Sequence, residues 1–181
     1  MLVGILFLII AVFVIGVIWW IATSNGIKVS GLKVKEAESG IDVALTKRYD
    51  VLTKMVDIVK GYKEYEASTM IELVKLRSGM SMREMNNANK NMDDVRRSIN
   101  VIAENYPQLR SSENFVELER AVVDVEEHLQ AARRLYNANV THYNTKIITF
   151  PSSIVAGSMG AVEKEFFEAE DMKKSDVKMN F

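Results

Sequence analysis

The first 27 residues carry no charged side chain, and this constrains the fold more than any other feature. All 23 basic and 24 acidic residues lie at or after Lys28. Residues 1–22 are apolar apart from Gly4 and Gly16, and glycine is tolerated in membrane-spanning helices. A helix of that length reaches about 33 Å, which matches a bilayer hydrocarbon core of roughly 30 Å. The sequence therefore predicts a transmembrane anchor at 1–22.

The C-terminal end of this run has the residues of a membrane–water interface. Trp19 and Trp20 are the only two tryptophans, and Lys28 is the first charge beyond them. A cleaved secretory signal is the alternative, since Ala22-Thr23-Ser24 is a small-residue sequence. No Lys or Arg precedes the run, however, and the run exceeds the roughly 7–15 apolar residues of a signal core. An uncleaved anchor is the better interpretation.

Charge asymmetry predicts the orientation. Lys28, Lys33 and Lys35 follow the span before the first acidic residue, Glu36. Because positive flanks stay on the cytoplasmic side, we expect a single-pass protein of the cell membrane with its N-terminus outside and residues 28–181 in the cytoplasm.

Residues 23–31 join the span to the rest of the chain. They contain two glycines and two serines, which is typical of a flexible linker. A continuous helix through Gly26 and Gly31 stays open as the alternative, because each glycine costs only about 1 kcal/mol in a helix.

Beyond the linker, apolar residues recur at helical spacing. The first predicted helix covers about 32–77 and ends at Ser78-Gly79. The second begins near Met82, behind the capping-box sequence Ser81-Met82-Arg83-Glu84, and ends before Pro107. The third opens after Ser111-Ser112 and continues to Phe150. The apolar positions expected to face the core are Ile41, Leu45, Tyr49, Leu52, Val56, Val59, Tyr62, Met70 and Val74 in the first helix, Met85, Ala88, Met92, Val95, Ile99, Ile102 and Tyr106 in the second, and Phe115, Leu118, Val122, Val125, Leu129, Ala132, Tyr136, Val140, Tyr143, Ile147 and Phe150 in the third.

These patterns predict an all-α fold. An N-terminal transmembrane helix is followed by a long antiparallel helical bundle with coiled-coil-like packing, comprising three long helices and a short C-terminal helix or turn. The bundle is expected at 32–172, with a short amphipathic stretch at 161–172 and a frayed tail at 173–181.

The sequence contains few residues or motifs that are typical of catalytic sites. The chain has no cysteine and two histidines, His128 and His142, which lie about 21 Å apart on one predicted helix and cannot share a metal. Phosphate-loop, dinucleotide, hydrolase-elbow and zinc-protease motifs do not occur in the sequence. Basic and acidic residues alternate without a nucleic-acid stripe. We expect no catalytic residue, cofactor, metal or nucleic-acid partner, and hence no enzyme.

Two groups of residues admit a binding role. Four methionines fall within 80–92 and could fill the core or line an adaptable groove. Tyr136-Asn137 and Tyr143-Asn144 repeat after seven residues, so both pairs face the same side of the helix. Such a polar ladder sets register in a bundle or, alternatively, recognises a ligand.

Several short motifs resemble the LemA family of bacterial and archaeal proteins, in order and in spacing. The matching residues are Ile41-Asp42-Val43, Leu45, Lys47-Arg48-Tyr49-Asp50, Val59-Lys60-Gly61-Tyr62, Glu66, Tyr106-Pro107-Gln108-Leu109, Phe115, Ala132-Arg133, both Tyr-Asn pairs, Phe150-Pro151 and Phe167-Glu168. The sequence departs from the family pattern at Glu38, Thr53 and Tyr65, where Trp, Pro and His are usual. The resemblance implies a membrane-anchored helical bundle without an established enzymatic activity.

Two functions follow as hypotheses. The first is a non-enzymatic membrane-anchored scaffold or adaptor that binds an unknown protein partner or another copy of itself. The second is an accessory envelope protein that binds a small ligand or peptide, through the ladder or the acidic residues Glu168, Glu170 and Asp171, and presents it to a membrane protease or similar system.

Overall fold

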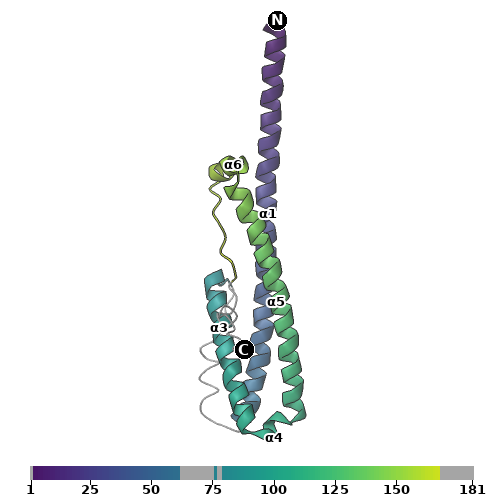
Figure 1. Ribbon diagram of the computed structural model, residues 1–181, viewed down its shortest axis with the longest axis vertical. Coiled ribbons are helices and arrows are strands. Elements are labelled where there is room, and N and C mark those ends of the chain that lie inside the picture. Colours follow the sequence, from purple (N-terminus) through teal and green to yellow (C-terminus); the bar gives the residue numbers. More distant parts are fainter. Residues whose placement is uncertain (1, 62–75, 77–78, 168–181) are drawn as a thin grey trace, which may run out of the picture. The chain divides into compact units, whose positions relative to one another are not determined.

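The computed structural model is helical and describes residues 2–61, 76 and 79–167 (Figure 1). Within these residues the helices are α1 (Leu2–Lys60), α3 (Met82–Asn105), α4 (Pro107–Arg110), α5 (Glu113–Ile148) and α6 (Ser152–Ser158), and no strand occurs among them. The all-α class, with a long apolar N-terminal helix ahead of a helical bundle, is confirmed. The predicted tail at 173–181 lies outside the described residues.

The chain divides into two compact units that share α1 and α5. The first unit comprises Met1–Glu38 and Asn137–Lys164, and the second comprises Ser39–Tyr136 and Glu165–Phe181. Each unit therefore takes one part of each long helix, and the two are described separately below.

In the first unit, α1 changes from exposed to packed near Ile27. All described side chains from Leu2 to Ala22 are exposed, whereas Ile27 and Val34 are buried. The C-terminal part of α5 runs antiparallel to this part of α1, because Asn139 Nδ2 donates to the Lys33 carbonyl at 3.4 Å while Lys146 Nζ donates to the Gly26 carbonyl at 3.3 Å. Helix α1 is thus exposed over its apolar N-terminal segment and packs against α5 from about Ile27 onward.

The prediction of a flexible linker at 23–31 is wrong. Helix α1 continues through Gly26 and Gly31 without a break. The physical reason is packing: this segment lies against α5, where Tyr143 is beside Gly31 and Lys146 Nζ donates to the Gly26 carbonyl. Ser30 Oγ donates to the Gly26 carbonyl, four residues earlier, at 2.8 Å. This bond satisfies the buried hydroxyl within the helix, so the serine does not interrupt α1.

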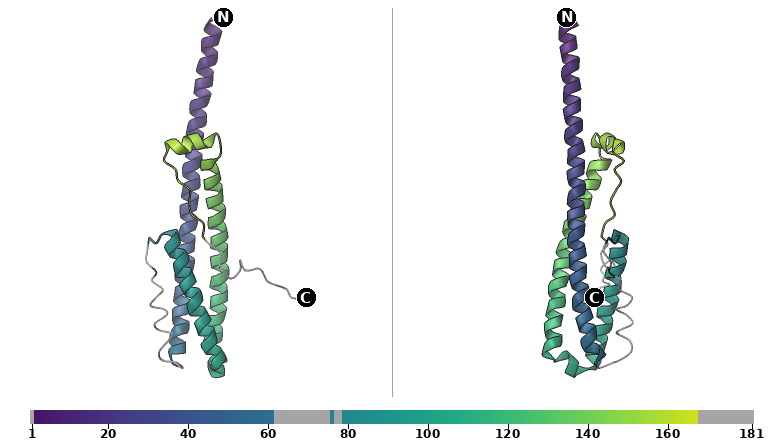
Figure 2. Two further views of the ribbon diagram at one scale, coloured as in Figure 1. Left: turned by 60° about the vertical axis from the view of Figure 1, so that its left-hand side comes forward. Right: turned by 180° about the vertical axis from the view of Figure 1, so that it is seen from behind.

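Among the described residues of the second unit, α1, α3 and α5 pack together to form the core (Figures 1 and 2). Polar contacts join Arg48 to Asn89 and Glu126, and a groove further along is lined by Met55, Arg96 and Glu119 together. As the residue number in α1 increases from 48 to 55, the number of the neighbouring residue increases in α3, from 89 to 96, and decreases in α5, from 126 to 119. Helix α5 runs antiparallel to both α1 and α3, which run in the same direction.

The predicted apolar stripes supply most of the core of this unit. The buried members are Ile41, Leu45, Leu52, Val56, Val59, Met85, Ala88, Met92, Val95, Ile99, Ile102, Phe115, Val122, Val125 and Leu129. Tyr106 was expected on the stripe but is 36% exposed, because α3 ends at Asn105. Tyr62, Met70 and Val74 lie outside the described residues.

Local signals set the ends of α3 as predicted. Ser81 caps the helix, and both bonds of the capping box with Glu84 are present. Pro107 stands at the start of α4, one turn of helix that the spacing analysis missed. Proline has no backbone N–H, and the first residue of a helix has no use for one, so a helix can begin at Pro107.

The first long helix ends earlier than predicted. Helix α1 stops at Lys60 instead of continuing to about Arg77, and Gly61 follows in a turn whose N–H donates to the Ile58 carbonyl at 3.3 Å. Glycine is a poor helix former and is favoured just beyond helix ends. The rest of that predicted helix falls almost entirely outside the described residues.

The C-terminal part of the first unit also differs from expectation. The short helix is α6, at 152–158, where the apolar pattern looked weak, and it lies crosswise over the end of α5 (Figure 2). The stretch predicted as amphipathic, 161–172, has no helix over its described part, 161–167. Gly160, with a φ of 64°, ends the helical turn, a conformation that glycine adopts at little cost.

Candidate functional site

Side chains that commonly carry catalysis are dispersed in the described part of the chain. His128 and His142 are both exposed, and His128 Nδ1 lies 2.8 Å from the Asp124 carbonyl. No group of three or more His, Asp or Glu side chains within 2–61, 76 and 79–167 has the arrangement of a metal site. The acidic residues Glu168, Glu170 and Asp171 lie outside the described residues.

The most distinctive polar cluster of the second unit is built around Arg48. This arginine is only 2% exposed. Its Nη1 donates to Asn89 Oδ1 at 2.5 Å, and its Nη2 donates to Glu126 Oε1 at 2.8 Å and also to Asp93 Oδ1. Arg96 Nη1 donates to the same Glu126 oxygen at 2.9 Å. One guanidinium thus joins α1 to α3 and α5.

The Arg48 cluster balances two arginines against two carboxylates. Because charges and hydrogen bonds are nearly matched, burial of the Arg48 guanidinium is tolerated. The match is incomplete, since Arg48 Nε is buried without a hydrogen-bond partner. The cluster links α1 to α3 and α5 through side chains at fixed positions on each helix, so its clearest role is structural.

Sequence reasoning missed Arg48 as a site residue and placed Tyr49 on the core stripe instead. Tyr49 is half-buried, and Arg48 occupies the core position. The signal was present: Arg48 follows Leu45 by three residues and precedes Leu52 by four, the spacing of one helix face. A charged residue at a core position points to a buried ionic partner.

In the first unit, the tyrosine–asparagine ladder contributes Asn144 and Tyr143. Asn144 is buried, its Nδ2 donates to the Lys164 carbonyl at 3.0 Å, and its Oδ1 accepts from the Lys164 N–H at 2.9 Å. One side-chain amide thus pairs with both backbone groups of a non-helical residue. Tyr143 is buried against Gly31 of α1.

In the second unit, the ladder contributes Tyr136. Its side chain is 2% exposed, and its hydroxyl donates to the Glu165 carbonyl at 2.8 Å. Two residues further, Phe167 is buried with the Arg133 guanidinium 5.0 Å from its ring centre, a cation–π distance. Asn137, the remaining ladder residue, is half-buried and belongs to the first unit. In each unit, the ladder residue binds the backbone of the segment that follows α6.

The methionine-rich stretch is part of the core. Met80, Met82, Met85 and Met92 are between 0% and 7% exposed. Of the two interpretations of these residues, the structure favours core filling over an open groove.

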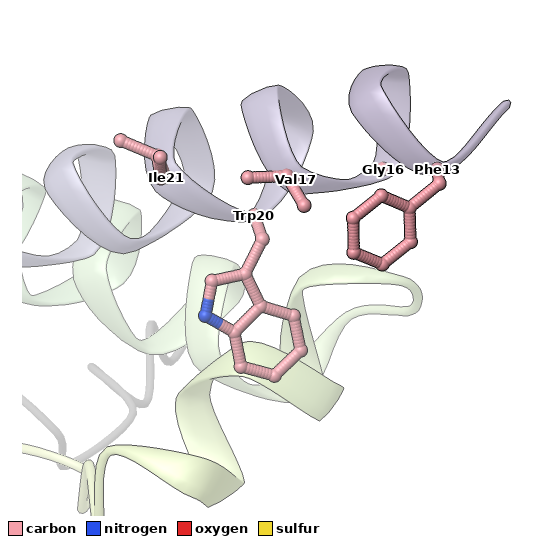
Figure 3. Close-up of a pocket in the computed structure, with 5 residues that line it drawn as sticks. All are labelled: Phe13, Gly16, Val17, Trp20 and Ile21. Carbon is pink, nitrogen blue, oxygen red and sulfur yellow. The ribbon is translucent and has the colours of Figure 1, made fainter. Parts of the chain in front are cut away.

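The residues predicted to lie at a membrane interface are exposed on α1. Trp19 and Trp20 are 39% and 41% exposed, and Lys28 is exposed one helical turn after Ser24. Among the described residues, α1 is the one helix that is both long enough and apolar enough to cross a membrane, by length and composition. Figure 3 shows a shallow hollow on this helix lined by Phe13, Gly16, Val17, Trp20 and Ile21, with the Trp20 ring projecting toward α6.

Comparison with known proteins gives one consistent family. A sequence model described as the LemA family matches residues 37–181. Protein LemA of Metamycoplasma hominis is 29% identical over 150 residues, which cover 80% of this chain and 68% of that protein. The matched region contains the Arg48 cluster, the ladder and α6. The chain belongs to the LemA family.

Proposed function

We propose that this protein is a non-enzymatic, single-pass membrane scaffold or adaptor, anchored by residues 1–22, that binds a protein partner or a second copy of itself. The observation that carries the proposal is the continuity of α1. Its exposed apolar segment and its packed segment are one helix, with burial beginning at Ile27. A body that follows a membrane span without a flexible linker is held at the bilayer surface, where membrane-associated partners are concentrated.

The predicted orientation places the bundle in the cytoplasm. The first unit carries Lys28, Lys33, Lys35, Lys146 and Lys164 against Glu36, Glu38 and Glu163, an excess of two positive charges. Positive residues beside a span favour the cytoplasmic side. This charge balance supports an outside N-terminus.

A thiol-labelling experiment tests the orientation. The chain has no cysteine, so one introduced thiol is the only target. Asn114, exposed in the first turn of α5, is a better site than Ser112, which is half-buried and donates to the Leu109 carbonyl. Asn114→Cys should react with a membrane-impermeant maleimide only after cell lysis. Labelling in intact cells would reverse the orientation and favour an envelope role.

A groove of the second unit is the place to look for the partner. It is lined by Met55, Arg96, Asn100, Glu119, Val122 and Val123 from α1, α3 and α5. Val123 at its edge is 52% exposed. A photo-crosslinking amino acid at Val123 in the full-length protein should capture one reproducible species in cells. The matched control is exposed Glu127 on α5, which does not line the groove. A monomer in detergent together with identical background capture at both positions would refute the scaffold proposal.

The second candidate function is peptide binding and presentation, and Asn144 supports it. Its side-chain amide pairs with the N–H and carbonyl of one extended residue, as a peptide-binding groove does. A peptide with the sequence of residues 161–167 should then bind a full-length variant whose own segment is weakened by Phe167→Ala. If Asn144→Ala only lowers stability and leaves peptide binding unchanged, the amide has a structural role alone.

A further inference from the structure

A second apolar surface lies beyond the anchor, in residues 147–162. This segment, here called the apolar cap, contains no Asp, Glu, Lys, Arg or His and is the longest such stretch after residue 27. It covers the end of α5, all of α6 and the turns on either side. Lys146 and Glu163 bound it.

Large apolar side chains of the cap point outward. Phe150 is 80% exposed, Ile148 61% and Ile154 56%, whereas Val155 and Ala156 are buried and hold α6 in place. Single exposed apolar residues are ordinary on a protein surface, but a contiguous uncharged group marks an interaction site. The cap is therefore apolar on both its inner and its outer side.

Polar groups of the cap are largely satisfied within it. Ser152 Oγ donates to the Thr149 carbonyl at 3.0 Å, Ser158 Oγ donates to the Val155 carbonyl at 2.7 Å, and Thr149 Oγ1 donates to the Thr145 carbonyl. Hydroxyl groups that already donate internally lose little when water is removed. The surface has the chemistry of one that enters a lipid environment.

Contacts inside the first unit place the cap on the side of Gly26 that faces the tryptophans. Lys146 Nζ donates to the Gly26 carbonyl at 3.3 Å and to Ser30 Oγ at 3.0 Å, and α5 runs antiparallel to α1 there. Ile148, the last residue of α5, lies two residues past Lys146, about 3 Å further toward the N-terminal end of α1, and the rest of the cap follows it in the chain. Trp20 lies about 9 Å from Gly26 in the same direction. The Trp20 ring projects toward α6 (Figure 3).

We infer that the apolar cap is a second membrane contact, lying in the lipid interface beside the anchor, with Phe150, Ile148 and Ile154 inserted at the boundary between headgroups and acyl chains. This inference rests on the proposed membrane anchoring. A lipid surface fits better than a second protein copy because the exposed cap belongs to the same unit as the exposed apolar segment of α1 and carries no charge to pair across a protein interface. Interfacial segments of this kind insert about 5–10 Å.

Depth-dependent fluorescence quenching tests the inference on the full-length chain. Phe150→Cys and Ile154→Cys, each labelled with an environment-sensitive fluorophore, are reconstituted in phosphatidylcholine–phosphatidylglycerol vesicles with lipids carrying a quencher near the headgroup. Both labels should be quenched several-fold more than one at Thr141→Cys. Thr141 is the matched control, because it is exposed on α5 in the same unit and lies between the residues that contact Gly31 and Lys33.

An anchor control separates the two possible failures. A label at Ile10→Cys should be quenched by lipids carrying the quencher deep in the acyl chain. If Ile10 is quenched and the cap labels match Thr141, the cap inference fails while the anchor stands. If Ile10 is not quenched either, the anchoring proposal itself fails. The cap labels could instead be shielded from water without being quenched by the lipids. If that shielding weakens when the protein-to-lipid ratio is lowered ten-fold, the surface binds a second copy and the inference is overturned.

Discussion

The two units use the same pair of helices but hold them together with different chemistry. In the first unit, Tyr143 of α5 packs beside Gly31 of α1, and lysine and asparagine side chains bind backbone carbonyls. In the second unit, an aliphatic core encloses the Arg48 cluster. Backbone-directed bonds depend on helix position alone, whereas an ionic cluster depends on particular partners. The first unit is therefore expected to tolerate substitution better than the second.

The largest expected effect comes from removing the central arginine of the second unit. Arg48→Ala removes the hydrogen bonds of the guanidinium to Asn89, Asp93 and Glu126 and opens a buried space. Loss of one member of a buried ionic cluster costs about 3–5 kcal/mol. Chemical denaturation of the full-length protein in detergent, followed by circular dichroism, should show this loss. Arg96→Ala, at a site 37% exposed, should cost about 1 kcal/mol or less, and equal effects would contradict the assignment of Arg48 as the centre.

A smaller loss is expected from the ladder residue of the first unit. Asn144→Ala removes two hydrogen bonds to the Lys164 backbone. At about 1 kcal/mol per net hydrogen bond, the cost is about 2 kcal/mol at most. Hydrogen exchange at the Lys164 amide should accelerate, while amides near Arg48 in α1 stay protected. Unchanged exchange at Lys164 would show that the pairing is not maintained in solution.

The two glycines of α1 provide a test with the opposite sign. Gly26→Ala with Gly31→Ala should stabilise the protein by about 1 kcal/mol, because alanine is the better helix former and each added Cβ meets only ordinary contacts, at 3.6 Å and 3.5 Å. Thermal unfolding measures the change. If 23–31 were a flexible linker, the double variant would leave unfolding of the bundle unchanged.

The smallest effect is expected for an exposed ion pair of the second unit. Arg83 Nη2 and Glu165 Oε1 are 3.4 Å apart, and both side chains are largely exposed. Such pairs contribute about 0–1 kcal/mol. Arg83→Gln should therefore shift the unfolding midpoint only slightly, and the shift should be smaller still at high salt. A loss comparable to that of Asn144→Ala would show that side-chain charge, and not the backbone, fixes the segment after α6.

Much of the fold could be predicted because its signals are local. The capping box at Ser81, the stop before Pro107 and the apolar stripes of α3 and α5 each depend on residues within one or two turns. The errors have a common cause. The helix through 23–31 and the extended segment at 161–167 depend on partners far along the chain, such as Lys146 for Gly26 and Asn144 for Lys164.

The candidate site residues divide in the same way. Trp19, Trp20 and Lys28 follow from composition, because an uncharged apolar run and its flanks can be read directly. Tyr136 and Asn144 were identified by their seven-residue repeat, but their carbonyl partners in Glu165 and Lys164 could not be, since those contacts join a helix to a segment without regular structure.

By itself the sequence determined an uncharged apolar N-terminal segment, an all-helical body and most of the residues that form the core, because periodicity and charge are properties of neighbouring residues. Tertiary structure decided that α1 continues through its glycines, that Arg48 is buried among α1, α3 and α5, and that the uncharged segment 147–162 exposes large apolar side chains in the same unit as the apolar part of α1. Each of these depends on which distant groups satisfy a backbone carbonyl, a buried charge or an exposed apolar surface.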